Sequence, residues 1–276
     1  MCRWLAYSGS PIRLEELLVK RDSSLIDQSL HARQGATTTN GDGFGVGWYQ
    51  PGEAPRLYRS IHPAWNDRNL RELSAGISSP LFLAHIRAAT GTAIQETNTH
   101  PFRYGNRLWM HNGMIRDFAR IRRELLLAVD DSLFTSIEGT TDSEAMFYLA
   151  LTFGLESEPI AAVERMVGFV EATARARGIE LPVQMTVATS DGQSTWVFRY
   201  SSEGASRSLY VSTRVGALQA LYPDNEELAG LSQDARVVVS EPLGDLPGVW
   251  NEVPEAHAGI VQAGADELRP FIPRLP

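Results

Sequence analysis

Short apolar runs separated by glycine-rich or polar breaks occupy both ends of the chain, a pattern typical of strands. The pattern predicts strands at residues 2–7, 44–49, 81–88, 108–112, 184–189, 195–200, 208–212, 236–240 and 258–262. Helices are predicted at residues 14–19, 117–129, 143–153 and 159–176. Asp191-Gly192 separates two of the predicted strands and indicates a hairpin.

The elements follow the order strands, helices, strands. This order predicts an α+β fold in which two mainly antiparallel sheets pack together and helices cover the outside. No segment has the composition of a linker, so we expect a single domain over residues 2–276.

Polar breaks between these elements predict loops at residues 33–43 and 91–101. The segment 40–45 taken alone reads as a tight hairpin and lacks the spacing of a phosphate-binding loop. Asn112-Gly113 is a turn signal at the end of the strand predicted before it. Either Thr141 or Asp142 is expected to cap the helix that follows.

Composition and charge narrow the possible partners. Of the 276 residues, 43% are apolar and 21% charged, which excludes wholesale disorder. The net charge of −8 argues against nucleic acid or an anionic membrane, since both need a basic footprint. No run approaches the roughly 20 apolar residues of a membrane span, and the first ten residues lack a signal peptide's apolar run. We therefore expect a cytoplasmic protein.

The single cysteine, Cys2, directly follows the initiator methionine. It leaves no partner for an intramolecular disulfide and no Cys-based zinc site, and a lone cysteine is most often a small buried hydrophobe. Removal of the methionine, which tolerates a small second residue, would give Cys2 a free α-amine. Such an amine has a pKa of about 7.7–8.0 and suits a general base near neutral pH. One residue would then supply both nucleophile and base.

Other positions have both a functional and an ordinary interpretation. Arg87, at the end of an apolar strand, can hold a carboxylate through two hydrogen bonds or form a surface salt bridge. Asn112 and Gly113 can supply an oxyanion hole or simply make a turn. Asp142 can bind an ammonium group or cap its helix. With Thr90 beside the arginine, the functional interpretations together fit one substrate, a γ-glutamyl amide.

These residues, in this order behind a cysteine at position 2, resemble the class II glutamine amidotransferases, a family of N-terminal-nucleophile hydrolases. The resemblance implies a four-layer αββα fold, and segment 40–45 and Arg33 match further family features. It also implies site roles: Cys2 as nucleophile, Asn112 and Gly113 as oxyanion hole, Arg87 and Thr90 as carboxylate ligands, and Asp142 as ammonium ligand. Many members have Trp-Ala-Thr-His-Gly after the arginine, whereas this chain has Ala88-Ala89-Thr90-Gly91.

The motifs span residues 2 to 144, and the chain is similar to standalone members, including the γ-glutamyl hydrolase of ergothioneine biosynthesis. The first hypothesis is hydrolysis of a γ-glutamyl amide through a Cys2 thioester, with no cofactor and no metal. A second is a glutaminase subunit that delivers ammonia to a partner synthase; a homo-oligomer is also open. The identity of the leaving amine stays open, and its contacts are expected in segments 91–101 and 40–45.

Two further hypotheses come from other classes. One is a metal hydrolase that uses His85, His100, His111 and Asp142, although these histidines lack the i, i+4 spacing of the commonest zinc sites. The other is a non-catalytic small-molecule binder, which follows if Met1 stays attached and the α-amine of Cys2 is never freed.

Overall fold

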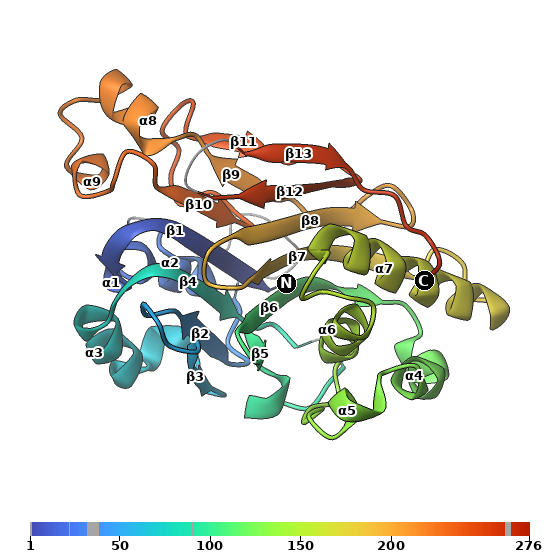
Figure 1. Cartoon of the computed structure of the whole chain (residues 1–276). Helices are drawn as coiled ribbons and strands as arrows, with labels where there is room; N and C mark the ends of the chain where they lie inside the picture. The colour runs from blue at the N-terminus through green and yellow to red at the C-terminus, as the bar shows by residue number, and fades with distance from the viewer. Residues whose placement is uncertain (1, 22, 32–38, 90, 263–265) are drawn as a thin grey trace.

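The computed structural model describes residues 2–21, 23–31, 39–89, 91–262 and 266–276. Thr90 and Arg33, both named above, lie outside these ranges. The described strands form two antiparallel sheets (Figure 1). The first sheet has the order β11 (Trp250–Glu252), β9 (Tyr210–Ser212), β10 (Arg236–Val239), β1 (Arg3–Arg13), β4 (Ser78–Ile86), β2 (Phe44–Trp48) and β3 (Arg56–Ser60). The second has the order β13 (Glu267–Pro270), β12 (His257–Val261), β8 (Thr195–Ser201), β7 (Val183–Ser190), β6 (Arg107–Ile115) and β5 (Phe102–Tyr104).

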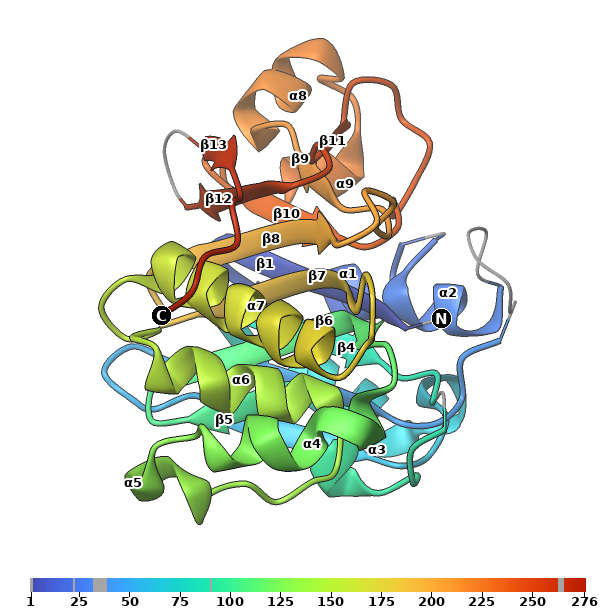
Figure 2. The same ribbon diagram turned by 90° about the vertical axis from the view of Figure 1, so that its right-hand side faces the viewer.

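Helices cover the outer face of each sheet (Figures 1 and 2). On the side of the first sheet lie α1 (Glu15–Leu18), α2 (Leu25–Leu30) and α3 (Arg68–Gly76). On the side of the second sheet lie α4 (Phe118–Leu127), α5 (Asp131–Phe134), α6 (Asp142–Thr152) and α7 (Pro159–Ala176). The remaining described helical segments are α8 (Val215–Leu221), α9 (Glu226–Ala229) and the short 3₁₀ turns Ala64–Asn66 and Glu96–Asn98.

Strand alternation explains why the layers form. Successive side chains of a strand point to opposite faces, so each sheet can bury apolar residues on both sides. In β1, Trp4 and Ala6 join the apolar core between the sheets, whereas Leu5 and Tyr7 join the core under α1 and α2. A third core lies between the second sheet and α4–α7. Three cores between four layers give the αββα sandwich, so the α+β prediction is confirmed.

Two local predictions are wrong, and the structure gives the reason for each. Asn112-Gly113 makes no turn, because β7 keeps pairing with β6 past this point and Gly113 lies opposite Met185. The segment 40–45 makes no tight hairpin, because its backbone runs alongside the residue that follows β4. Asp42 N donates to Arg87 O at 3.2 Å, and Arg87 N donates to Gly43 O at 2.8 Å. The hairpin predicted at Asp191-Gly192 is confirmed between β7 and β8.

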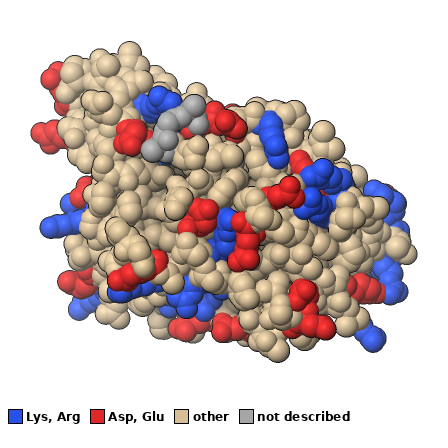
Figure 3. Space-filling view, viewed as in Figure 1, with Lys and Arg blue, Asp and Glu red and all other residues tan. Residues whose placement is uncertain are grey.

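Two features of the structure concern the membrane and nucleic-acid partners that the sequence argues against. No helix among the described residues has the length and apolarity needed to cross a bilayer. On the face shown in Figure 3, acidic and basic side chains are interspersed and do not gather into one basic field.

Candidate active site

A cavity of about 370 Å³ opens where the end of β4, the end of β6 and the start of α6 meet beside the start of β1. Among the residues to which the resemblance assigns a role, Cys2, Arg87, Gly113 and Asp142 line it, and so do His100 and His111 of the metal hypothesis. The strand order explains this meeting, because β1 pairs with β4 in one sheet and β6 lies in the facing sheet. Residues from four distant stretches of sequence therefore surround one small space.

The thiol of Cys2 sits against the chain just after β4. Ala88 N donates to Cys2 Sγ at 3.3 Å, and Sγ lies 3.5 Å from Ala88 O. Burial raises the pKa of the Cys2 thiol above its usual value, while the Ala88 hydrogen bond and the charges of Arg87 and Arg3 act in the opposite direction. The raised pKa keeps the thiol protonated at rest, so a nucleophilic role requires a base that removes its proton.

The backbone of Cys2 is held by two side-chain donors. Asn112 Nδ2 donates to Cys2 O at 3.1 Å, and Arg3 Nη1 donates to the same oxygen at 3.0 Å. Arg3 Nε in turn lies 2.8 Å from Glu241 Oε2, and both side chains are buried. This ion pair was not found from the sequence, since nothing in the local pattern joins residue 241 to the start of the chain.

Arg87 is buried, and the surface salt bridge considered for it is not what the structure contains. Its Nη2 donates to Thr92 Oγ1 at 2.7 Å and to Ala93 O at 3.0 Å. Its Nη1 is buried and has no hydrogen-bond partner among the described residues. Burial lowers the pKa of Arg87, and the charges of Cys2 and Asp42 raise it. A buried guanidinium with an uncommitted donor at a cavity wall suits an anionic ligand such as a carboxylate.

Asp142 is the first residue of α6, and Thr141 is the helix cap, since its Oγ1 accepts from Glu144 N at 3.2 Å. The Asp142 carboxylate joins the helix to β6: Oδ2 accepts from Ile115 N at 2.7 Å, and Oδ1 accepts from Ser143 N at 2.8 Å. These bonds fix the carboxylate at the cavity wall. It keeps acceptor capacity for a cationic ligand, because each carboxylate oxygen has two lone pairs.

Gly113 occupies a position that no other residue fits. A Cβ there would overlap the carbonyl oxygen of Gln184 and come within 2.6 Å of His111 Nε2. The His111 ring is itself fixed, since its Nδ1 lies 2.7 Å from Ser143 Oγ. The glycine therefore lets β6 pass close to β7 at the cavity, which places Asn112 beside Cys2.

Two buried histidines with tilted rings lie side by side at the cavity, and His100 lines it. The rings of His85 and His100 are 4.3 Å apart, both are buried, and none of their ring nitrogens has a hydrogen-bond partner among the described residues. Burial lowers the pKa of His85 to about 3 and lowers that of His100 well below its usual value. Within the described ranges, no group of three or more His, Cys, Asp or Glu side chains is arranged to hold a metal ion. The set of His85, His100, His111 and Asp142 considered from the sequence is therefore not a ligand cluster.

Because these buried histidines are neutral, we expect the stability of the folded protein to fall in acid. Unfolded His85 takes up a proton below its unperturbed pKa of about 6.5, whereas folded His85 stays neutral down to about pH 3. The unfolded state therefore binds more protons, and stability falls as the pH falls. We expect His85 to remove about 2 kcal/mol from the free energy of unfolding between pH 7 and pH 5. Urea unfolding of His85→Gln should show a flatter pH dependence than the wild type. The same loss in both proteins, or the same flattening in a variant of the exposed His62, would contradict this.

Comparisons with known proteins identify the family of this chain. Residues 18–269 match the family model described as class-II glutamine amidotransferases. The chain is 33% identical over 308 residues to the probable glutamine amidotransferase DUG3 of Saccharomyces cerevisiae, covering 99% of this chain and 85% of that protein. It is 27% identical to the gamma-glutamyl-hercynylcysteine sulfoxide hydrolase of Mycolicibacterium smegmatis, covering 93% and 94% of the two chains.

Solved structures are similar over the whole fold. A glutamine aminotransferase class-II domain protein from Silicibacter pomeroyi superposes with a TM-score of 0.76 at 32% identity, covering 99% of this chain and all (100%) of the other. The glutamine phosphoribosylpyrophosphate amidotransferase of Bacillus subtilis superposes with a TM-score of 0.65 at 15% identity, over 99% of this chain and 50% of that one. The second similarity concerns the fold alone, which is that of the N-terminal-nucleophile hydrolases.

Proposed function

Because this chain belongs to the class II glutamine amidotransferases, we propose that it hydrolyses the γ-amide bond of a γ-glutamyl compound with Cys2 as the nucleophile. The observation that carries the proposal is the cavity itself, in which a cysteine thiol, a buried guanidinium and a carboxylate face one space. These are the three groups that a γ-glutamyl amide requires: a nucleophile for its amide carbon, a cation for its α-carboxylate and an anion for its α-ammonium.

The first half of the reaction forms a thioester. Once the methionine is removed, the α-amine of Cys2, directly or through a water, accepts the thiol proton. The thiolate attacks the γ-carbonyl carbon, a C–S bond forms, and the carbonyl oxygen becomes an oxyanion. The C–N bond then breaks, and the leaving nitrogen takes the proton from the α-ammonium of Cys2. Burial supports this route, because a thiol with a raised pKa ionises only when a base is beside it.

The second half releases glutamate. A water, deprotonated by the same α-amine, attacks the thioester carbon, the C–S bond breaks, and the thiolate is reprotonated. In both halves the oxyanion is stabilised by the Gly113 N–H and by the second N–H of the Asn112 side-chain amide. The first N–H of that amide already donates to the Cys2 carbonyl, which supports a role close to the nucleophile.

Arg87 and Asp142 hold the glutamyl half. The uncommitted Nη1 of Arg87 supports recognition of the α-carboxylate, and Thr90, three residues further along the chain, is proposed as a second carboxylate ligand. The Asp142 carboxylate, anchored by two backbone N–H groups, recognises the α-ammonium. Such fixed charges orient the γ-amide toward Cys2 without a cofactor.

The test is intact-mass spectrometry on the active protein, with γ-glutamylglycine as the substrate. We expect the protein to lack Met1 and, after rapid acid quenching, to carry a γ-glutamyl group on the peptide that begins with Cys2. Hydroxylamine should remove the group, since thioesters are cleaved by it. A fully active protein that retains Met1, or an acyl group found on another residue, would overturn the proposal. Substrate binding without any glutamate release would favour the non-catalytic binder.

A further inference from the structure

The two charged groups that hold the glutamyl half come from different layers of the fold, and this inference rests on the proposed function. Arg87 directly follows β4 in the first sheet, whereas Asp142 begins α6, which covers the second sheet. Their targets, the α-carboxylate and the α-ammonium, are attached to one carbon atom of the substrate. Both charges can therefore be bound at once only if the spacing between Arg87 and Asp142 is held constant.

Asn98 holds the loop that contacts Arg87. Its side chain is buried and lines the cavity. Asn98 Nδ2 donates to Ala93 O at 3.0 Å, and the same oxygen accepts from Arg87 Nη2 at 3.0 Å. Because the guanidinium and the amide share one carbonyl oxygen, a shift of Asn98 would move a direct partner of Arg87.

The same side chain also holds the segment that leads to Asp142. Asn98 Nδ2 donates to Thr140 Oγ1 at 3.1 Å, and Asn98 Oδ1 accepts from Thr140 N at 2.8 Å. Thr140 is followed by the helix cap Thr141 and then by Asp142. One amide therefore connects the loop at Arg87 with the residues at the start of α6.

The segment before α6 is held tightly between Asn98 and the helix. Glu144, in the first turn of α6, accepts from Glu138 N at 3.0 Å and from Gly139 N at 2.7 Å. A Cβ on Gly139 would lie 2.6 Å from Asn98 Oδ1 and 2.8 Å from Glu144 Oε2. Since the glycine is enclosed on both sides, the position of Asn98 is passed on to the helix that carries Asp142.

We propose that Asn98 is a positioning residue that keeps Arg87 and Asp142 at the spacing of the two α-substituents, so that the enzyme selects substrates that carry both. The two N–H groups of its amide donate to Ala93 and Thr140, so Asn98 acts through these residues. A substrate with only one of the two charges can settle onto its own partner and does not depend on this spacing. Asn98 thereby determines how strongly the two charges reinforce each other.

The experiment measures kcat/KM on three substrates with the wild type and with Asn98→Ala. γ-Glutamylglycine carries both charges, 4-aminobutanoylglycine lacks the α-carboxylate, and glutarylglycine lacks the α-ammonium. Asn98→Ala should lower kcat/KM for γ-glutamylglycine by about 10-fold and change that for the other two substrates by less than about 2-fold.

Thr140→Val provides a second variant, because Thr140 is exposed and a residue of similar shape there should not prevent folding. It removes the acceptor of one Asn98 N–H and should lower kcat/KM for γ-glutamylglycine alone, by about 3-fold. Thermal unfolding checks that both variants are folded, and Thr140→Val supplies the measurement if Asn98→Ala is not.

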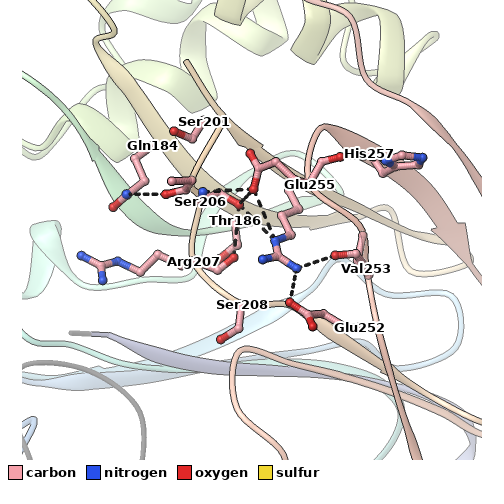
Figure 4. Close-up of polar contacts among 12 residues, drawn as sticks. Gln184, Thr186, Ser201, Ser206, Arg207, Ser208, Glu252, Val253, Glu255 and His257 are labelled. Carbon is pink, nitrogen blue, oxygen red and sulfur yellow. Dashed lines mark hydrogen bonds and ion pairs between the residues drawn. The ribbon is translucent and has the colours of Figure 1, made fainter. Parts of the chain in front are cut away.

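Two variants outside this connection serve as controls. Thr97→Val changes the residue before Asn98, and Thr97 Oγ1 accepts from Gln95 Nε2 at 2.8 Å. Ser206→Ala removes a hydroxyl that donates to Glu255 Oε2 (Figure 4). Neither Thr97 nor Ser206 lines the cavity, and neither variant should change the selection for both charges. The same pattern in a control as in Asn98→Ala would overturn the assignment to Asn98.

Three other results would also overturn this assignment. An equal loss on all three substrates would give Asn98 a role in the general structure of the cavity, and a loss shared with only one single-charge substrate would give it a role at one wall. Unchanged values would leave it no role. If γ-glutamylglycine gives no Cys2 thioester in the wild type, the proposed function fails and takes this inference with it. A thioester together with any of the three results removes the Asn98 assignment alone.

Discussion

The Cys2→Ala variant is expected to release glutamate from γ-glutamylglycine at least about 10⁴-fold more slowly than the wild type. The proposed route has no second nucleophile, and without a thioester the amide must be attacked by water. The variant keeps the α-amine, the buried Arg87 and the Asp142 carboxylate, so it should still bind the substrate. Glutamate release measured over hours, together with calorimetric binding, separates the loss of chemistry from a loss of affinity.

Matched variants make this test sharper. Cys2→Ser keeps the shape of the side chain and should retain more activity than Cys2→Ala, because a hydroxyl is a weaker nucleophile than a thiol but still a nucleophile. Both variants should unfold within about 1 kcal/mol of the wild type, since the strand pairing of β1 starts at Arg3 and uses backbone groups. Wild-type rates in Cys2→Ala would contradict the mechanism.

The layered fold could be predicted because its cause is local. Alternation within the segments that form β1 and β4 and the apolar run of α7 are visible in the sequence, and the predicted helix 159–176 matches Pro159–Ala176. The edge strands β3, β5, β11 and β13 were missed. They are three to five residues long, and little of their surface is buried, so they leave a weak apolar pattern.

The candidate site was predictable only in part, for a similar reason. Arg87 directly follows the apolar strand β4, Asn112 follows the apolar run of β6, and Asp142 lies at a helix start, so each has a local signal. Glu241, which pairs with Arg3, has no local signal. Sheet pairing between β1 and β10 brings it there, and that pairing is fixed by long-range packing.

The sequence also predicts where the protein contacts the leaving amine. From the sequence, contacts to the leaving amine were expected in segments 91–101 and 40–45. Gly91, Thr92, Asn98 and His100 of the first segment line the cavity. The second segment is tied to the chain after β4, where Ala89 N donates to Asp42 Oδ2 at 2.8 Å. Segment 40–45 thereby supports the backbone beside Cys2, and contacts of both segments with the leaving amine stay a prediction.

The second large effect is expected from the residues that hold the glutamyl half. Arg87→Gln should lower kcat/KM for γ-glutamylglycine by about 10³-fold, because it removes a buried cation that pairs with the α-carboxylate. Asp142→Asn should lower it by about 10²-fold, since the amide keeps the hydrogen-bond acceptor but loses the charge that attracts the α-ammonium. Steady-state kinetics at pH 7 gives both values.

A crossed substrate set distinguishes recognition from a structural role. 4-Aminobutanoylglycine lacks the α-carboxylate, and glutarylglycine lacks the α-ammonium. If each residue recognises its own group, the ratio of wild-type to Arg87→Gln activity should fall toward one with 4-aminobutanoylglycine and stay large with glutarylglycine, and Asp142→Asn should show the reverse. If either variant loses the same factor on all three substrates, its residue supports the fold of the cavity and does not bind the glutamyl group. The crossed pattern is decisive because damage to the cavity has no reason to follow the presence of one charge on the substrate.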